Sequence, residues 1–196
     1  MNNEKFFILG IDAGFRNTGL SFLKFNKGKI KVVSGTVICT ELDKSLESVT
    51  EQIINSSNKL YYGIKTFIES IHNPYYDIAI EYPTGGSRSA AANRAMGSAI
   101  SIISIVLQEN NLHYNIISPK EVKDIVCGEI KYKKIPKQFI ISYVNKKGIA
   151  FEDIKENISK DNPLFSLAKL KSKFEHFADA TAAAIVLNNK IKDKRK

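Results

Sequence analysis

Two carboxylates each close an apolar run, and both positions suit a chemical role. Asp12 ends the run 6–11, and Glu81 ends the short run 76–80. An apolar run of this kind is typical of a strand that is covered on both faces of its sheet. A carboxylate at the end of such a strand is costly unless a cation, a metal ion or a bound proton compensates its charge. Taken alone, each residue is also compatible with an ordinary strand end.

A histidine and a third carboxylate lie three residues apart near the C-terminus. His176 and Asp179 share one face of a predicted helix, whereas Glu175 points about a third of a turn away. The alanines that follow let this helix lie close against a sheet, but they give no reason for the His and the Asp. If the strands of Asp12 and Glu81 are parallel neighbours, their carboxylates fall at the same sheet edge. Three carboxylates and an imidazole at one point suit divalent cations and two-metal phosphodiester hydrolysis.

The elements that must position these residues alternate between strands and helices. The first three strands are expected to form an antiparallel meander, because Gly-containing turns separate them. Ser118-Pro119-Lys120-Glu121 matches a helix start with Ser as N-cap. Periodicity predicts strands at 6–11, 20–25, 30–39, 76–80 and 113–117, and helices at 42–70, 87–107, 118–126, 135–144 and 174–187.

Length and composition predict one globular domain that spans residues 1–196. The Lys-rich passage 145–173 is expected to be an insertion in this domain, and the basic tail 190–196 is expected to fray. No apolar run approaches the roughly 20 residues of a membrane span, and the first residues do not resemble a signal peptide, so we expect a cytoplasmic protein. Cys39 and Cys127 have no metal-binding spacing and are expected to be reduced and structural.

The net charge of +9 is unevenly distributed. Residues 1–117 hold 11 basic and 10 acidic side chains, whereas residues 118–196 hold 18 basic and 10 acidic ones. This asymmetry favours a polyanionic partner, nucleic acid before a membrane surface. Solubility and a Lys-rich coding bias are the alternative explanation. Lys outnumbers Arg, which suits phosphate contacts better than base readout.

Four short motifs follow one another along the chain in a characteristic order. They are Gly-Ile-Asp12-Ala-Gly with a later Thr-Gly, Ile-Ala-Ile-Glu81, Pro119-Lys-Glu-Val-Lys123, and His176-Phe-Ala-Asp179-Ala. The ordered set resembles the RuvC-type Holliday junction resolvases of the RNase H-like nuclease superfamily, and it extends from residue 6 to residue 187. Ala13 stands where that family usually has Pro.

The resemblance implies an α/β, RNase H-like fold, with a mixed five-stranded sheet flanked by helices. It also implies a homodimeric endonuclease that cuts four-way DNA junctions by symmetric paired nicks. Asp12, Glu81, His176 and Asp179 would be its catalytic and metal-binding residues. Two Mg2+ ions would bind at each active site, and Mn2+ would substitute for them.

The resemblance and the basic charge also suggest contact residues for DNA and for a second copy. Tyr82 directly follows Glu81, so the aromatic wedge of the family has no counterpart at the usual spacing. Such divergence fits a phage or mobile-element member, acting in the cytoplasm of a bacterial or phage-infected cell. The expected DNA contacts are Arg16, Tyr82, Arg88, Lys120, Lys123, Lys131, Lys133 and Lys134, and the expected dimer contacts are Ala91, Ala95, Met96 and Ala99.

The sequence leaves three alternative functions open. A broader branched-DNA nuclease, or an RNase H-like nuclease that processes RNA, shares the Gly-x-Asp-x-Gly opening. Actin-like ATPases and sugar kinases share it too, but they need two such subdomains and a longer chain. A non-catalytic DNA-binding module is disfavoured, because three carboxylates would then meet in a basic protein with no cation to compensate them.

Overall fold

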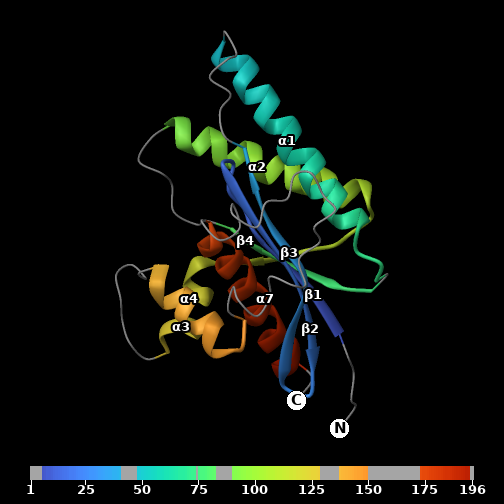
Figure 1. The fold of residues 1–196 in the computed structure, drawn as a ribbon, viewed down its shortest axis with the longest axis vertical. Helices are drawn as coiled ribbons and strands as arrows, with labels where there is room; N and C mark the ends of the chain where they lie inside the picture. The colour runs from blue at the N-terminus through green and yellow to red at the C-terminus, as the bar shows by residue number, and fades with distance from the viewer. Residues whose placement is uncertain are drawn as a thin grey trace.

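A mixed five-stranded β-sheet forms the centre of the fold. The computed structural model describes residues 6–40, 48–73, 75–82, 90–128, 137–149 and 173–194. β1 (Phe6–Asp12), β2 (Asn17–Asn26) and β3 (Lys29–Cys39) form the predicted antiparallel meander. β4 (Asp77–Glu81) runs parallel to β1, and β5 (Asn115–Ile117) runs parallel to β4. The spatial order is β3-β2-β1-β4-β5, which confirms the predicted mixed sheet (Figure 1).

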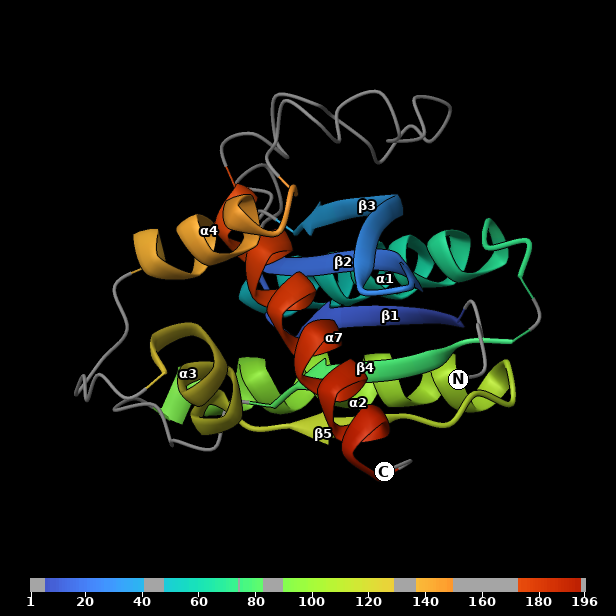
Figure 2. The same ribbon diagram turned by 90° about the horizontal axis from the view of Figure 1, so that it is seen from below.

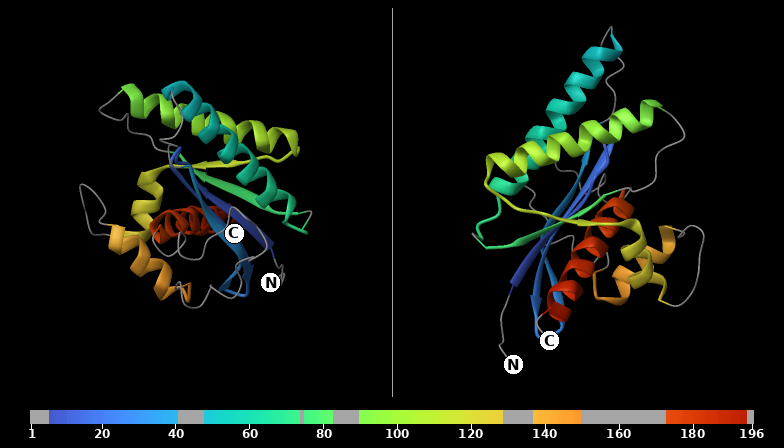
Figure 3. Two further views of the ribbon diagram at one scale, coloured as in Figure 1. Left: turned by 45° about the horizontal axis from the view of Figure 1, so that its top comes forward. Right: turned by 180° about the vertical axis from the view of Figure 1, so that it is seen from behind.

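Helices cover both faces of this sheet (Figures 2 and 3). α1 (Val49–Glu69) and α2 (Ala90–Glu109) lie on one face. α3 (Pro119–Cys127), α4 (Lys137–Lys146) and α7 (Phe174–Lys194) lie on the other. α7 runs obliquely across the sheet and contacts all five strands (Figure 2). It therefore reaches the ends of strands that are far apart in the sequence.

The central strand β1 is buried on both faces, as its apolar run predicts. Ile8 packs into the layer of α7, whereas Leu9 and Ile11 pack into the layer of α1 and α2. All three side chains are fully buried. Because side chains alternate along a strand, one apolar run serves both cores. The strand therefore holds its last residue, Asp12, in a fixed place at the sheet edge.

Helix α3 begins as the sequence predicts. The backbone N–H of Ser118 donates to the Glu121 carboxylate at 2.7 Å, and the Glu121 N–H donates to the Ser118 hydroxyl at 3.3 Å. These reciprocal bonds form a capping box, with Pro119 in the first turn. The cap fixes the start of α3 directly after β5.

The C-terminal helix ends later than Leu187, where the sequence predicts its end. α7 stays helical to Lys194. The fraying of the tail stays a prediction. Lys190 forms an ion pair with Glu121 of α3, and basic side chains in the last turn are favoured by the helix dipole. Partial burial opposes the charge of Glu121, but hydrogen bonds from Lys190 and Ser118 outweigh it and lower its pKa to about 2.

We expect Lys190→Ala to lower the free energy of unfolding by about 0.5 to 1 kcal/mol at neutral pH, as for a partly exposed ion pair. Glu121 has a lower pKa in the folded chain than in the unfolded one. Its stabilising contribution is therefore present above about pH 4.5 and is lost as the pH falls toward 2. Urea unfolding at pH 7 and pH 3 measures both effects. Lys192→Ala, at an exposed neighbouring position, is the matched control; an equal loss in both variants would contradict the ion-pair account.

The remaining expectations have mixed outcomes. β5 begins at Asn115, two residues later than predicted. Cys39 and Cys127 are both reduced, as predicted. Most of the 145–173 passage lies outside the described residues, so its role as an insertion stays a prediction. Over the described ranges, no helix combines the length and the apolar character needed to cross a membrane.

Candidate active site

Asp12 and Glu81 lie side by side at one edge of the sheet. They are direct register partners at the carboxyl ends of the parallel strands β1 and β4. The parallel pairing therefore confirms the predicted proximity of the two carboxylates. In open α/β sheets this edge is where ligands bind.

Close packing of α7 on the sheet brings the third carboxylate and the histidine to this edge. Gly19 of β2 pairs with Asp12 across the sheet. A Cβ atom on Gly19 would lie 2.0 Å from the carbonyl oxygen of His176, and one on Gly10 would lie 1.9 Å from that of Ala180. No side chain fits at either position. The first turns of α7 therefore rest directly on the backbone of β1 and β2.

This packing joins Asp12, His176 and Asp179 into one group. Each of the three offers a ligand atom, and these atoms all lie within 4.8 Å of one another. Nδ1 of His176 is 2.8 Å from Oδ2 of Asp12, and both side chains are about one-fifth exposed. The predicted convergence of these three residues is therefore present in the structure, at a place that solvent and substrate can reach.

Glu81 lies next to this three-residue group without being part of it, and the Oε2 atom of its carboxylate is buried. Its Oε2 atom has no hydrogen-bond partner among the described residues. Burial, together with the charges of Asp12 and Asp179, raises the pKa of Glu81 to about 9. A buried carboxylate beside two others needs a compensating proton or cation. The donor set thus fits a hard divalent cation, which prefers carboxylate oxygens.

Two features of the site escape the sequence analysis. Gly19 is needed for close approach, and the Thr-Gly of the first motif is its only sequence signal. Glu175 does not join the three-residue group, but its Oε1 atom lies 3.6 Å from Nε2 of His176. Helical spacing indicates where its Cα lies, and the flexible side chain then reaches back to the ring.

The predicted DNA contacts divide into three sets. Arg16 and Lys120 are exposed, and Lys123 is half-buried on α3. Tyr82 is 36% exposed, and its N–H donates to the carbonyl of Ile117 at 2.9 Å. The positions outside the described residues are Arg88, Lys131, Lys133 and Lys134.

The predicted dimer contacts lie on α2, but they do not share one environment. Ala99 is fully buried in the core between α2 and the sheet, so its side chain is not available to a partner. Ala95 and Met96 are half-buried. Ala91 lies in the first turn of the helix. Of the predicted contacts, Ala99 is therefore excluded, and the α2 surface available to a second copy lies toward the N-terminal half of the helix.

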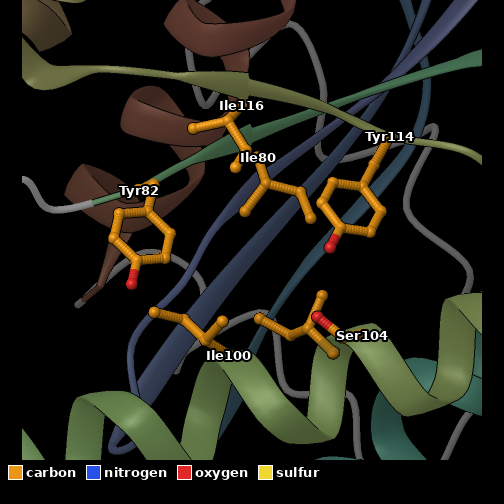
Figure 4. A pocket seen from close by; sticks show the side chains of 7 residues that line it. Ile80, Tyr82, Ile100, Ser104, Tyr114 and Ile116 are labelled. Carbon is orange, nitrogen blue, oxygen red and sulfur yellow. The ribbon is translucent and has the colours of Figure 1, made fainter.

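A small apolar pocket lies between α2 and the strands β4 and β5, on the face of the sheet that α1 and α2 cover (Figure 4). Tyr82 and Tyr114 stand at opposite ends of it, and isoleucines from both strands and from α2 lie between them. Its lining holds no carboxylate, imidazole or thiol. The pocket therefore offers an apolar contact surface but no group for metal binding.

Comparison with known proteins places these features in a family. The sequence model of the family "Crossover junction endodeoxyribonuclease RuvC" matches residues 8–149. The chain belongs to the RuvC family. This membership confirms the predicted enzyme class, a metal-dependent crossover junction endodeoxyribonuclease. The match ends before α7, so the positions of His176 and Asp179 depend on the structure rather than on the match.

Solved structures show the same fold. The chain is similar to Thermus thermophilus RuvC in complex with a Holliday junction substrate, at 19% identity and a TM-score of 0.62, over 92% of each chain. A second Thermus thermophilus RuvC structure gives 19% identity and a TM-score of 0.61, again over 92% of each chain. The predicted RNase H-like fold is thereby confirmed for this RuvC-family chain. The comparison with curated protein sequences gives no match.

Proposed function

We propose that this RuvC-family chain resolves four-way DNA junctions by Mg2+-dependent hydrolysis of one phosphodiester bond in each of two strands. The observation that carries the proposal is the group of Asp12, His176 and Asp179, together with Glu81, the register partner of Asp12 in the parallel pair of β1 and β4. Three carboxylates on β1, β4 and α7 match the ligands that hard divalent cations prefer.

Asp12, Glu81 and Asp179 would hold the cations, two Mg2+ ions at each site, with Mn2+ as a substitute. Bound divalent cations supply an activated water and stabilise the charge that develops on the leaving oxygen. His176 faces Asp12 through Nδ1 and would ligate a cation or position the water or the scissile phosphate.

The basic side chains would bind the duplex arms through phosphate contacts. The net charge of +9 and the exposed Arg16 and Lys120 support this role. Lys123 on α3 and the segment with Lys131, Lys133 and Lys134 would extend the contact surface. Arg88 and Tyr82, which follow Glu81 closely in the sequence, would contact DNA. Affinity for DNA should then fall steeply with salt.

A homodimer would explain why junctions are cut in pairs. Two copies related by a twofold axis present two identical acidic sites, which suit symmetric nicks in a symmetric junction. Ala95 and Met96 on α2, with Ala91 in the same helix, are the proposed contacts. The solved Thermus thermophilus RuvC complex contains a Holliday junction. We place the activity in the cytoplasm of a bacterial or phage-infected cell.

The test uses a labelled four-way junction, a linear duplex of the same sequence and a Y-shaped DNA, each with Mg2+ or with EDTA. We expect paired, symmetric nicks in the junction alone, and only with Mg2+. Denaturing gels measure the nicks, and native gels measure binding. Equal cutting of the Y-shaped DNA would favour a broader branched-DNA nuclease, and no cutting of any DNA would contradict the proposal and direct the test to structured RNA.

A further inference from the structure

The imidazole of His176 lies between two carboxylates. Nδ1 is 2.8 Å from Oδ2 of Asp12, and Nε2 is 3.6 Å from Oε1 of Glu175. The first distance is that of a hydrogen bond, whereas the second is a close electrostatic contact that a small side-chain rotation would shorten into one. Contacts at both ring nitrogens restrict the rotation of the ring more than one contact does.

The backbone of His176 is already fixed by its surroundings. Its N–H donates to the carbonyl of Lys173 at 3.0 Å, and its own carbonyl rests against Gly19. The rotation of the ring is therefore what remains for neighbouring side chains to set. Glu175 is in the first turn of α7, where the helix dipole favours a negative charge.

From these contacts we infer that Glu175 is a positioning residue, which orients the ring of His176 so that Nδ1 faces Asp12. The inference rests on the proposed function, because it assigns a role within the same site. A histidine that ligates a metal generally donates its other ring N–H to a carboxylate or a carbonyl, and this second contact fixes its tautomer and its orientation. With a cation at Nδ1, the single proton of the neutral ring would lie on Nε2, and Glu175 is placed to accept a hydrogen bond from this Nε2–H.

Glu175 is well suited to substitution. Its side chain is 28% exposed, and that of His176 is 21% exposed, so truncation of Glu175 leaves no core cavity. Glu175→Ala removes the carboxylate, whereas Glu175→Gln keeps an acceptor oxygen at the same distance along the side chain. The pair therefore separates loss of the contact from loss of the charge.

We expect Glu175→Ala to weaken Mg2+ binding about tenfold and to lower the turnover of junction cleavage by a similar factor, with the KM for the junction unchanged. Calorimetry on the DNA-free protein measures the first effect, and steady-state cleavage measures the second. Glu175→Gln should stay within about twofold of the wild type in both measurements, because an acceptor oxygen remains. If Glu175→Gln impairs Mg2+ binding and turnover as much as Glu175→Ala does, the inference that an acceptor at this position orients the ring is wrong.

A double-mutant cycle with His176→Ala decides whether Glu175 acts through the ring. The carboxylates of Asp12, Glu81 and Asp179 remain in this background, so Mg2+ binding can still be measured. If Glu175 only orients the ring, Glu175→Ala has no further effect once the ring is gone. If Glu175→Ala instead lowers Mg2+ affinity equally with and without the His176 ring, Glu175 acts directly on the cation or the DNA. That result would contradict the inference.

The same measurements distinguish failure of this inference from failure of the proposed function. A wild-type protein that neither binds Mg2+ nor cuts junctions contradicts the proposed function, and the role of Glu175 falls with it. A wild-type protein that does both, with Glu175→Ala unchanged, overturns the role of Glu175 alone.

Discussion

Asp12→Asn is expected to abolish junction cleavage while leaving junction binding intact. We expect cleavage to fall by roughly a thousandfold or more, which corresponds to about 4 kcal/mol in the activation free energy. Asn keeps the size and the shape of the side chain and can still contact His176. It removes the charge that the proposed cation site requires from its most central ligand.

The position of Asp12 explains why a single charge matters so much. It is the register partner of Glu81 in the sheet and lies 2.8 Å from His176, so it links both halves of the site. Junction binding depends instead on basic side chains that contact phosphates. Loss of a negative charge near the DNA backbone should leave that binding unchanged or strengthen it when no metal is present.

Asp77→Asn is the matched control for this experiment. Asp77 begins β4, the strand that Glu81 ends, and it is exposed at the opposite edge of the sheet. The chemical change is the same, but no member of the acidic group is near it in the register. Wild-type cleavage is expected for this control. If Asp12→Asn binds poorly but still cuts, the assignment of Asp12 is wrong.

The sequence predicts those site residues whose position depends on a single strand or helix. Asp12 and Glu81 are predictable because each ends an apolar strand, and Ser118 with Glu121 is predictable because a capping box needs only four residues. The register that places the two carboxylates side by side follows from parallel pairing of neighbouring strands. These signals are contained in short stretches of the chain.

The contacts between distant elements are what the sequence does not reveal. The ion pair of Glu121 with Lys190 joins α3 to α7 through two residues that are 69 positions apart in the sequence. Gly19 supports His176 only because α7 crosses β2 at that point. Glu175 reaches His176 through side-chain torsions that a helical period does not specify.

Glu81 raises a different problem, because its carboxylate destabilises the metal-free fold when it ionises. Burial and the neighbouring charges of Asp12 and Asp179 raise its pKa to about 9. In the unfolded chain the same carboxyl ionises near its ordinary value of 4.5. Above that value the unfolded state binds fewer protons than the folded state, so the free energy of unfolding falls as the pH rises from about 4.5 to 9. This stabilising contribution is therefore fully present only below about pH 4.5.

Glu81→Gln is expected to stabilise the metal-free protein at pH 8 and to abolish cleavage. The amide stays neutral at every pH, so the variant should lack the downward slope, which is at most about 1.4 kcal/mol per pH unit for one proton. Near pH 4.5 the two proteins should unfold at similar temperatures. With Mg2+ present, the wild type should gain thermal stability that increases with pH, because a bound cation replaces the proton on Glu81.

Thermal unfolding between pH 4.5 and pH 9, in EDTA and in Mg2+, measures these effects together. Glu121→Gln is an informative control, because the pKa of Glu121 is lowered and the charge of that residue stabilises the fold. Its substitution should reduce stability at pH 8, the opposite sign to Glu81→Gln. A Glu81→Gln variant that is less stable than the wild type at pH 8 in EDTA would show that the buried carboxylate is already compensated within the chain. In that case the charge of Glu81 would need no compensation by a cation, and the strongest physical reason for a cation at this end of the sheet would be lost.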